Sequence, residues 1–396
     1  MKEGWRMVKL GEVCEKVRNI KWTETSSEHL YQYIDLTSVD REASFISDTQ
    51  LINSENAPSR AKQPVIKGDI LFATTRPTLK RVCVIPYNYD GAICSTGFCV
   101  LRPKSDILCN WIYYALKDDS FMKYIMPLQK GASYPAVTDG DVKNFKLPLP
   151  PLEEQHRIVS ILDASFEKID ALKKNAEENL KNAKALFQQV LAQELKPKEG
   201  WVEKKLGEIG DIQTGTTPDT KDKTNFGNFI PFVKPADVNY DGLGGLNYNN
   251  EGLSELGVSQ SRLIKRKSVL MVCIGATISK TGYNTCDVTC NQQINTLTPY
   301  KDDYKYCYYA MIAPSFKYEI LKEGNSHQTT LPIINKKKWS NLIISLPPLE
   351  EQHRIVRTLD TLSEKCRRLE EVAQQTIREC DALKQSILRQ AFSGEL

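Results

Sequence analysis

Residues Leu149 to Val159 read Leu-Pro-Pro-Leu-Glu-Glu-Gln-His-Arg-Ile-Val, and the same eleven letters recur at Leu346 to Val356. The two copies lie 197 residues apart, about half of the 396-residue chain. A second pair of similar segments opens each half, at 2–12 and at 198–208, where Lys-Glu-Gly-Trp is followed by Leu-Gly-Glu. Because a long identical repeat indicates a duplicated structural unit, the chain is predicted to consist of two copies of one unit.

The repeated motif also divides each copy into two segments, since the apolar pattern changes where the motif begins. We expect four segments in chain order. They are a globular domain over 1–147, a long helix over 148–196, a second globular domain over 197–346 and a second long helix over 347–396.

Each motif is followed by apolar residues at alternating spacings of four and three, the pattern of a coiled coil. The pattern predicts one long helix after each motif, with the two stripes burying each other. Two ordinary amphipathic helices, each packed on its own domain, remain the alternative. The predicted seam consists of Ile158, Leu162, Ser165, Ile169, Leu172, Ala176, Asn179, Ala183, Leu186 and Val190, and of Ile355, Leu359, Leu362, Cys366, Leu369, Ala373, Thr376, Cys380, Leu383 and Ile387.

The two large regions contain short apolar runs separated by Gly, Asn, Asp and Pro, as expected for strands joined by turns. The runs fall at corresponding places, for example at 68–72 and 267–271. Short helices are expected near 113–116 and 306–312. The predicted fold class is α+β, with two mixed, mostly β globular domains joined by two long helices.

Composition and missing motifs restrict the function. The chain has 53 basic and 49 acidic residues and 41% hydrophobic residues, which is typical of a globular protein and not of a disordered one. It has no GxxxxGK(S/T), GxGxxG, HExxH or GxSxG motif and no Asp/Asn-Pro-Pro-Tyr sequence, so it does not look like an enzyme acting alone. Eleven cysteines without a CxxC pair predict free thiols and no metal site. Without an apolar signal or spanning segment, we expect a cytoplasmic protein with no membrane contact.

A β-rich region, the repeated motif and a long heptad helix, all given twice, resemble the specificity subunit of type I restriction–modification systems. The openings at Gly4 and Gly200 and the ending over 391–396 are similar to those of that family. The resemblance covers essentially the whole chain. It implies that each globular region is a target recognition domain that reads one half of an asymmetric bipartite DNA site. It also implies that the two helices form an antiparallel coiled coil that sets the spacing.

The same resemblance implies the partners and cofactors. The expected partners are double-stranded DNA, two methyltransferase subunits docked on the coiled coil, and motor–nuclease subunits in the full complex. The chain itself would be non-catalytic and without a cofactor. Its complex would methylate adenine with S-adenosylmethionine and cleave DNA with ATP and Mg in the motor–nuclease subunit. Equivalent residues of the two motifs are the predicted partner contacts: His156, Arg157, His353 and Arg354.

Loops at corresponding places keep their apolar flanks and change their polar residues, as expected if each region reads a different short sequence. Arg and Lys pair with guanine edges, Asn and Gln pair with adenine, and Ser and Thr pair with either. The predicted DNA contacts are Arg76, Lys80, Arg81, Lys130, Ser133 and Tyr134 in the first region, and Thr277, Ser279, Lys280, Asn291, Gln292, Gln293, His327, Gln328 and Thr329 in the second.

Two other classes of function remain open from the residues alone. In the first, the coiled coil is an assembly scaffold and the globules bind protein or glycan. In the second, the chain is a nuclease or methyltransferase by itself, which the missing motifs disfavour. Binding to DNA that weakens steeply with salt would favour a DNA-reading protein, because neutralised phosphates release counterions.

Overall fold

The computed structural model describes residues 2–40, 44–239, 242–324 and 333–396. Contacts between residues divide the chain into two units. Unit 1 comprises Met1–Lys174 and Thr376–Leu396, and unit 2 comprises Asn175–Gln375. Each unit therefore combines one globular region with a part of each long helix. Because the units cut both helices, the four-segment division expected from the sequence stays a prediction.

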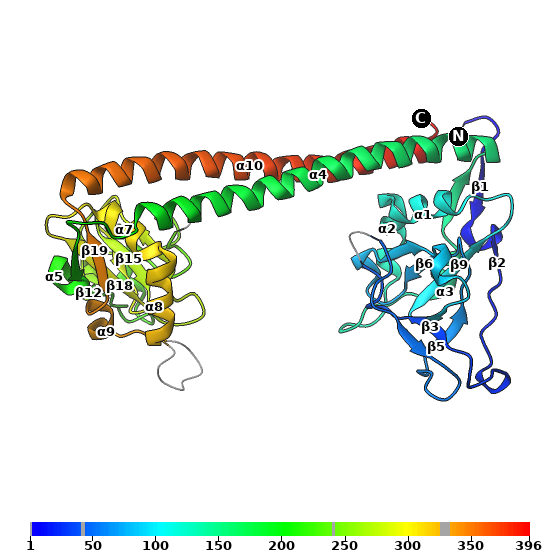
Figure 1. Ribbon diagram of the computed structural model, residues 1–396, viewed down its shortest axis with the longest axis horizontal. Coiled ribbons are helices and arrows are strands. Elements are labelled where there is room, and N and C mark those ends of the chain that lie inside the picture. Colours follow the sequence, from blue (N-terminus) through cyan, green and yellow to red (C-terminus); the bar gives the residue numbers. More distant parts are fainter. Residues whose placement is uncertain (1, 41–43, 240–241, 325–332) are drawn as a thin grey trace. The chain divides into compact units, whose positions relative to one another are not determined.

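The globular region of unit 1 is built on sheets with the strand orders β2-β9-β6-β7 and β4-β3-β8-β5, and on a β1-β10 pair (Figure 1). Strands β3 and β8 are parallel, and β6 and β9 are antiparallel. The strands are β1 (Arg6–Lys9), β2 (Cys14–Glu15), β3 (Tyr31–Ile34), β4 (Gln50–Ile52), β5 (Ala61–Pro64), β6 (Ile70–Ala73), β7 (Val82–Val84), β8 (Ile93–Ser95), β9 (Phe98–Pro103) and β10 (Lys146–Leu149). The short helices are α1 (Cys109–Lys117), α2 (Asp119–Ile125) and α3 (Asp139–Lys143).

Unit 2 repeats this plan with the orders β12-β18-β15-β16 and β14-β13-β17 and a β11-β19 pair. Its strands are β11 (Val202–Lys205), β12 (Gly210–Thr214), β13 (Phe226–Val233), β14 (Gly252–Leu253), β15 (Val269–Val272), β16 (Thr281–Tyr283), β17 (Thr289–Cys290), β18 (Ile294–Pro299) and β19 (Ile343–Leu346). Its short helices are α5 (Leu206–Ile209), α6 (Glu255–Ser259), α7 (Tyr304–Ile312), α8 (Pro314–Gly324) and α9 (Lys336–Ser340). The α+β class with a duplicated, mostly β globule is confirmed.

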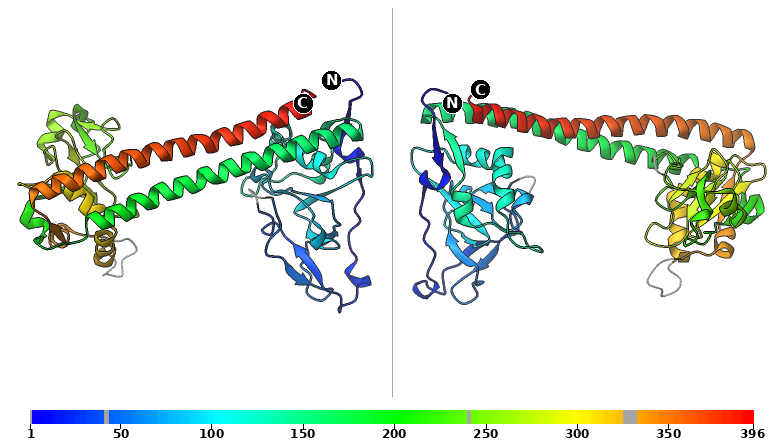
Figure 2. Two further views of the ribbon diagram at one scale, coloured as in Figure 1. Left: turned by 45° about the horizontal axis from the view of Figure 1, so that its top comes forward. Right: turned by 180° about the vertical axis from the view of Figure 1, so that it is seen from behind.

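Both predicted long helices are present, as α4 (Leu152–Glu194) and α10 (Leu349–Ser393). In each unit a stretch of α4 lies beside a stretch of α10, and the two run in opposite directions (Figures 1 and 2). In unit 1 the Lys173 ammonium lies 2.8 Å from the Asp381 carboxylate, and Lys384 pairs with Asp170. In unit 2 the Arg354 guanidinium lies 2.6 Å from the Glu194 carboxylate. The pairing is therefore antiparallel.

The predicted seam of the coiled coil is only half right. Deep burial does recur every seven residues, but four of the leucines three residues further along are 45–55% exposed, and only Leu362 of that leucine row is half-buried. The structure instead half-buries the row four residues further along, which includes Phe166, Lys173 and Phe187. Positions i+3 and i+4 lie on opposite sides of residue i on a helix, so apolarity alone chose the wrong side. The buried residues are Leu162, Ile169, Ala176, Ala183, Leu359, Cys366, Ala373 and Cys380, and the exposed ones are Leu172, Leu186, Leu369 and Leu383.

The repeated motif joins each globule to its long helix through a buried glutamine. The side-chain oxygen of Gln155 accepts a hydrogen bond from the N–H of Leu108 at 3.0 Å, and its amide nitrogen donates to the Pro150 carbonyl at 3.1 Å. Gln352 repeats both bonds, with the N–H of Asp303 at 2.9 Å and the Pro347 carbonyl at 3.0 Å. A buried amide without such partners would be destabilising, which explains a glutamine at this place in each motif.

Each globule also shares one hydrophobic core with the helices of its unit. In unit 1, Trp111 and Phe121 of the globule pack in one cluster with Leu162 of α4 and Leu388 of α10. In unit 2 the corresponding cluster unites residues of α7 and β15 with Leu191 and Leu359 of the long helices. Within each unit, therefore, the globule is held on the helices by continuous packing as well as by the motif glutamine.

Candidate nucleic-acid interface

Three loops meet at one edge of the unit 1 globule, joined by backbone hydrogen bonds. The N–H of Thr74 donates to the Gly97 carbonyl at 2.9 Å, and the N–H of Val137 donates to the Thr74 carbonyl at 3.0 Å. The N–H of Arg76 donates to the Pro135 carbonyl at 2.7 Å. We call this set, residues 74–81, 95–97 and 130–137, the unit 1 edge. It brings together all six residues that the sequence predicts as DNA contacts in the first region.

Unit 2 forms a corresponding edge from residues 273–280, 291–293 and 333–334. The N–H of Cys273 donates to the Gln293 carbonyl at 2.8 Å, and the N–H of Ile334 donates to the Cys273 carbonyl at 2.9 Å. These bonds repeat those of Thr74 with Gly97 and Val137. The edge holds six of the nine predicted contacts of the second region, whereas His327, Gln328 and Thr329 lie outside the described residues.

The central loops of the two edges have related backbones, with positive φ angles at the same two places. Arg76 and Gly275 occupy equivalent places, and both have positive φ angles, of 51° and 97°. Lys80 and Ser279 are likewise equivalent, at 49° and 72°. Such left-handed backbone is unusual for residues other than glycine. The two loops therefore share a special conformation while differing in side chains.

The last residue of each central loop is a cation that braces its own domain. The Arg81 guanidinium donates to the Leu36 carbonyl. The Lys280 ammonium donates to the Pro235 and Ala236 carbonyls, at 3.2 Å each. The acceptors lie on equivalent segments after β3 and β13. DNA contact by Arg81 and Lys280 stays a prediction, but both cations already have partners inside their domains.

The remaining side chains of the unit 1 edge differ in how they are engaged. The carbon at the centre of the Arg76 guanidinium lies 4.9 Å from the centroid of the Tyr134 ring. Lys80 forms an ion pair with Asp119, with 3.3 Å between the charged atoms. Lys130 and Ser133 are exposed.

Amides and hydroxyls dominate the unit 2 edge. Thr277 is exposed, and Ser279 is half-buried. The Asn291 amide donates to the Gln293 side-chain oxygen at 3.0 Å, and the Thr217 hydroxyl donates to the side-chain oxygen of Gln292. This edge offers mainly neutral hydrogen-bonding groups where the unit 1 edge offers cations.

Two further arginines lie beside the edges and were not predicted from the sequence. The N–H of Thr96 donates to the Arg60 carbonyl at 2.9 Å, which places exposed Arg60 next to the unit 1 edge. In unit 2, the Arg262 guanidinium donates to the Thr214 carbonyl at 2.6 Å, beside the segment that carries Thr217. Each arginine is distant in sequence from the loops it joins, and no local motif marks it.

The predicted partner contacts on the long helices are partly used within the chain. Arg157 donates to the Glu154 carboxylate at 2.6 Å and to the terminal Leu396 at 2.6 Å. Arg354 donates to Glu351 at 2.7 Å and to Glu194 at 2.6 Å. Hydrogen bonds from Arg157 and Lys2 lower the pKa of Glu154 to about 2. Each arginine thus ties the start of one long helix to the end of the other.

The two motif histidines are exposed. The imidazole of His353 lies 3.6 Å from the Asp303 carboxylate, and His156 is exposed on α4. Partner binding by His156, Arg157, His353 and Arg354 stays a prediction.

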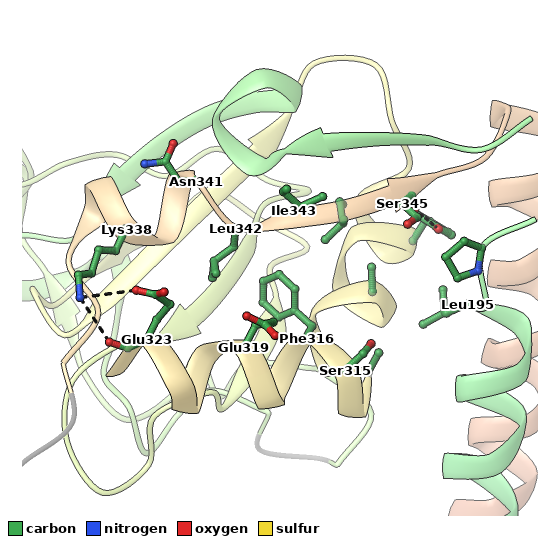
Figure 3. Close-up of a pocket in the computed structure, with 15 residues that line it drawn as sticks. Leu195, Ser315, Phe316, Glu319, Glu323, Lys338, Asn341, Leu342, Ile343 and Ser345 are labelled. Carbon is green, nitrogen blue, oxygen red and sulfur yellow. Dashed lines mark hydrogen bonds and ion pairs between the residues drawn. The ribbon is translucent and has the colours of Figure 1, made fainter. Parts of the chain in front are cut away.

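A groove of about 610 Å³ lies in unit 2 between α8, β19 and the end of α4 (Figure 3). Phe316 and Leu342 form part of its apolar lining. The Lys338 ammonium at its rim lies 3.6 Å from the Glu323 carboxylate and 3.4 Å from the Glu323 carbonyl, so this lysine is engaged within the domain. The lining contains no histidine or cysteine. Among the residues that the structure describes, no cluster of His, Cys, Asp and Glu could hold a metal ion.

Comparison with known proteins agrees with this duplicated architecture. The family described as Type I restriction modification DNA specificity domain matches residues 2–182 and, a second time, residues 198–379. The chain belongs to this family. As a specificity subunit it recognises DNA sequence, is itself non-catalytic, and assembles with the other subunits of a restriction–modification complex. In the part of the chain that is described, no helix has the length and apolarity to cross a membrane.

Specificity subunits of known systems match over most of their length. The HindI specificity subunit of Haemophilus influenzae is 24% identical over 380 residues, which cover 76% of this chain and 81% of that protein. A chain from a structural study of complex assembly and conformational transition of the type I restriction–modification system is 31% identical, with a TM-score of 0.82, covering 100% of this chain and 99% of that one. The HsdS subunit from Thermoanaerobacter tengcongensis is also 31% identical, with a TM-score of 0.61 and coverage of 100% and 98%. The predicted family resemblance is confirmed.

Proposed function

We propose that the two globular regions of this specificity subunit read the two different halves of an asymmetric bipartite site in double-stranded DNA. The observation that carries the proposal is the pair of edges. Both have a central loop with positive φ angles at the equivalent residues 76/275 and 80/279. The side chains mounted on that backbone differ in charge and in hydrogen-bonding type. Two domains that read different short DNA sequences require a shared loop framework with different polar side chains on it.

The long helices would dock two methyltransferase subunits, one on each unit. The exposed apolar residues of the coiled coil support this stoichiometry. Unit 1 carries Leu172 and Leu383, and unit 2 carries Leu186 and Leu369, about half exposed in each case. Residues 172 and 369, like 186 and 383, are 197 positions apart and hence equivalent. Each unit therefore offers the same leucine pair, one from each helix, to one copy of a partner.

The catalytic chemistry would reside in the partners. The docked subunits would bind S-adenosylmethionine and methylate adenine, and a motor–nuclease subunit with ATP and Mg would add cleavage. The complex would act on DNA in the cytoplasm. The paired helices would set the distance between the half-sites. Inserting one heptad after Ala176 and one after Ala373 keeps the helical phase and adds roughly 10 Å, so the preferred spacer should grow by about three base pairs.

Reconstitution tests the proposal. The full chain is mixed with its methyltransferase subunit, and methylated adenines are mapped on a random DNA library. We expect one split site with two different halves, and a complex of two methyltransferase subunits per chain by native mass spectrometry. Methylation by the purified chain alone, or DNA binding that is independent of sequence, would overturn the proposal. The double variant Leu172→Glu with Leu383→Glu should lose one partner copy, while exposed Lys181→Glu serves as the matched control.

A further inference from the structure

We propose that Arg76, held against Tyr134, reads a guanine in the half-site of the first globular region, and that the second region has no equivalent guanidinium reader. The inference rests on the proposed function and adds which base is read and by which residue.

Arg76 stands in a conformation that favours glycine. Its φ and ψ angles are 51° and 56°, and Gly275 occupies the equivalent place in unit 2 at φ 97°. The conformation is fixed from both sides, because the N–H of Arg76 donates to the Pro135 carbonyl at 2.7 Å and its carbonyl accepts from the N–H of Leu79 at 3.0 Å. In unit 2, Gly275 adopts a positive φ angle at this place without steric strain. An arginine at a strained position points to a role for its side chain.

The side chain is positioned in advance and is available to a ligand. Its guanidinium carbon lies 4.9 Å from the centroid of the Tyr134 ring, whose residue is 69% exposed. Stacking on an aromatic face restricts the orientation of the planar donor fork. Within the described part of the chain, the Arg76 guanidinium has no acidic or carbonyl partner. The neighbouring cations differ, since Lys80 pairs with Asp119 and Arg81 with the Leu36 carbonyl.

The geometry of the donor fork favours guanine over the other bases. Guanine presents two acceptors, O6 and N7, side by side in the major groove, and a guanidinium donates to both. Adenine presents one acceptor and one donor at the same place, so one of the two bonds is lost. Only the guanine edge uses both donors of a fork that the structure already holds in place.

A DNA phosphate also accepts a guanidinium fork, but the comparison of the units disfavours it. Phosphate contacts fix the position of a protein on the duplex and carry no sequence information, so two domains with one frame would be expected to share them. Position 76/275 instead changes from Arg to Gly while a positive φ angle is kept. Around Gly275 the space is open, and the nearest atom to an added β-carbon would be the amide nitrogen of Gln293 at 3.9 Å. At this position the two central loops therefore differ in their side chain.

The experiment measures methylation by the reconstituted complex on duplexes that carry each base at every position of both half-sites. Arg76→Gly removes the fork and relieves the backbone, and Arg76→Lys keeps the charge but not the fork. Both should reduce the preference for guanine at one position of the first half-site by roughly 5- to 150-fold. Tyr134→Leu should weaken the same preference less. The second half-site should be unchanged in every variant.

Arg18→Gly, which removes an exposed cation that is not one of the residues of the unit 1 edge, is the matched control and should leave both half-sites unchanged. Thermal unfolding of Arg76→Gly, expected at or above the wild-type midpoint, excludes loss of fold. An equal fall for all sequences would show a phosphate contact and overturn the inference, as would a first half-site without guanine or an unchanged preference. A wild-type complex that methylates no bipartite site would instead contradict the proposed function itself.

Discussion

The central loops over 73–81 and 272–280 carry different side chains on related backbones. In both, the last residue of the strand bonds to the last loop residue, from the N–H of Ala73 to the Arg81 carbonyl at 3.0 Å and from the N–H of Val272 to the Lys280 carbonyl at 2.8 Å. Inside the loops some backbone bonds differ, since the N–H of Lys80 donates to the Pro77 carbonyl at 2.9 Å whereas the N–H of Ser279 donates to the Val272 carbonyl at 2.9 Å. The side chains differ most strongly at position 76/275. The comparison teaches that the closing backbone bonds and the positive φ angles are common to the two loops, whereas the exposed side chains are not. We propose that selectivity resides in these exposed positions.

If the two globular regions share one fold, equivalent core residues should contribute equally to the stability of the two units. Leu162→Ala and Leu359→Ala each remove a fully buried side chain that packs between globule and helix. We expect each to destabilise its unit by about 2–5 kcal/mol. Hydrogen exchange followed by mass spectrometry would resolve the two units. Exposed Leu172→Ala is the control and should change stability by less than about 0.5 kcal/mol. A large loss of stability in one unit only would show that the two cores are not equivalent.

The bracing cations should be equivalent in effect although they differ in kind. Arg81→Met and Lys280→Met each remove a charged donor to a backbone carbonyl and leave the apolar stem. We expect a loss of about 1–2 kcal/mol in the affected unit, because each carbonyl loses a charge-assisted bond. DNA affinity should fall for all sequences alike, as measured by titration of labelled duplexes. A changed base preference would instead show that the cation contacts a base.

Substitutions at position 76/275 should change stability in opposite directions in the two units. Arg76→Gly relieves a strained backbone in unit 1, whereas Gly275→Ala introduces strain in unit 2. Gly275→Ala places a β-carbon at φ 97° with no atom closer than 3.9 Å, so strain alone should cost about 1–2 kcal/mol. Gly140→Ala in α3, where φ is ordinary, is the control and should be neutral or stabilising. Denaturant titration measures both. An unaffected Gly275→Ala would mean that the unit 2 loop does not need its left-handed conformation.

The smallest expected difference concerns the thiols. Cys286 of unit 2 is exposed, whereas Cys83 and Cys94 of unit 1 are buried. Burial raises the pKa of Cys83 to about 12, and partial burial together with Asp287 raises the pKa of Cys286 above its usual value. Because the thiolate is the reactive form, alkylation of Cys286 by iodoacetamide should rise about tenfold per pH unit from pH 7 to 9. Peptide mapping that finds Cys83 or Cys94 labelled as fast as Cys286 would contradict the described cores.

Much of the fold could be predicted from the repeat, because eleven identical residues and a heptad stripe are local signals. The side of the helix that faces its partner could not, since Leu172 and Leu186 are as apolar as a seam residue and only three-dimensional packing excludes them. The candidate site likewise combines residues that the sequence marks locally with residues that it does not. Arg76 and Tyr134 lie in polar loops, which can be recognised from the sequence alone. The engagement of Arg81 and Lys280, and the approach of Arg60 and Arg262, depend on residues far away in the chain.

The most direct test of the central claim places the same globular region at both positions in the chain. In this variant residues 197–346 are replaced by a second copy of residues 1–147, and both long helices are kept. The variant is reconstituted with the methyltransferase subunit, and methylated adenines are mapped on a random DNA library. If each region reads one half-site, the methylated site should contain two copies of the first half-site and none of the second. Retention of the original second half-site by an active complex would contradict the account.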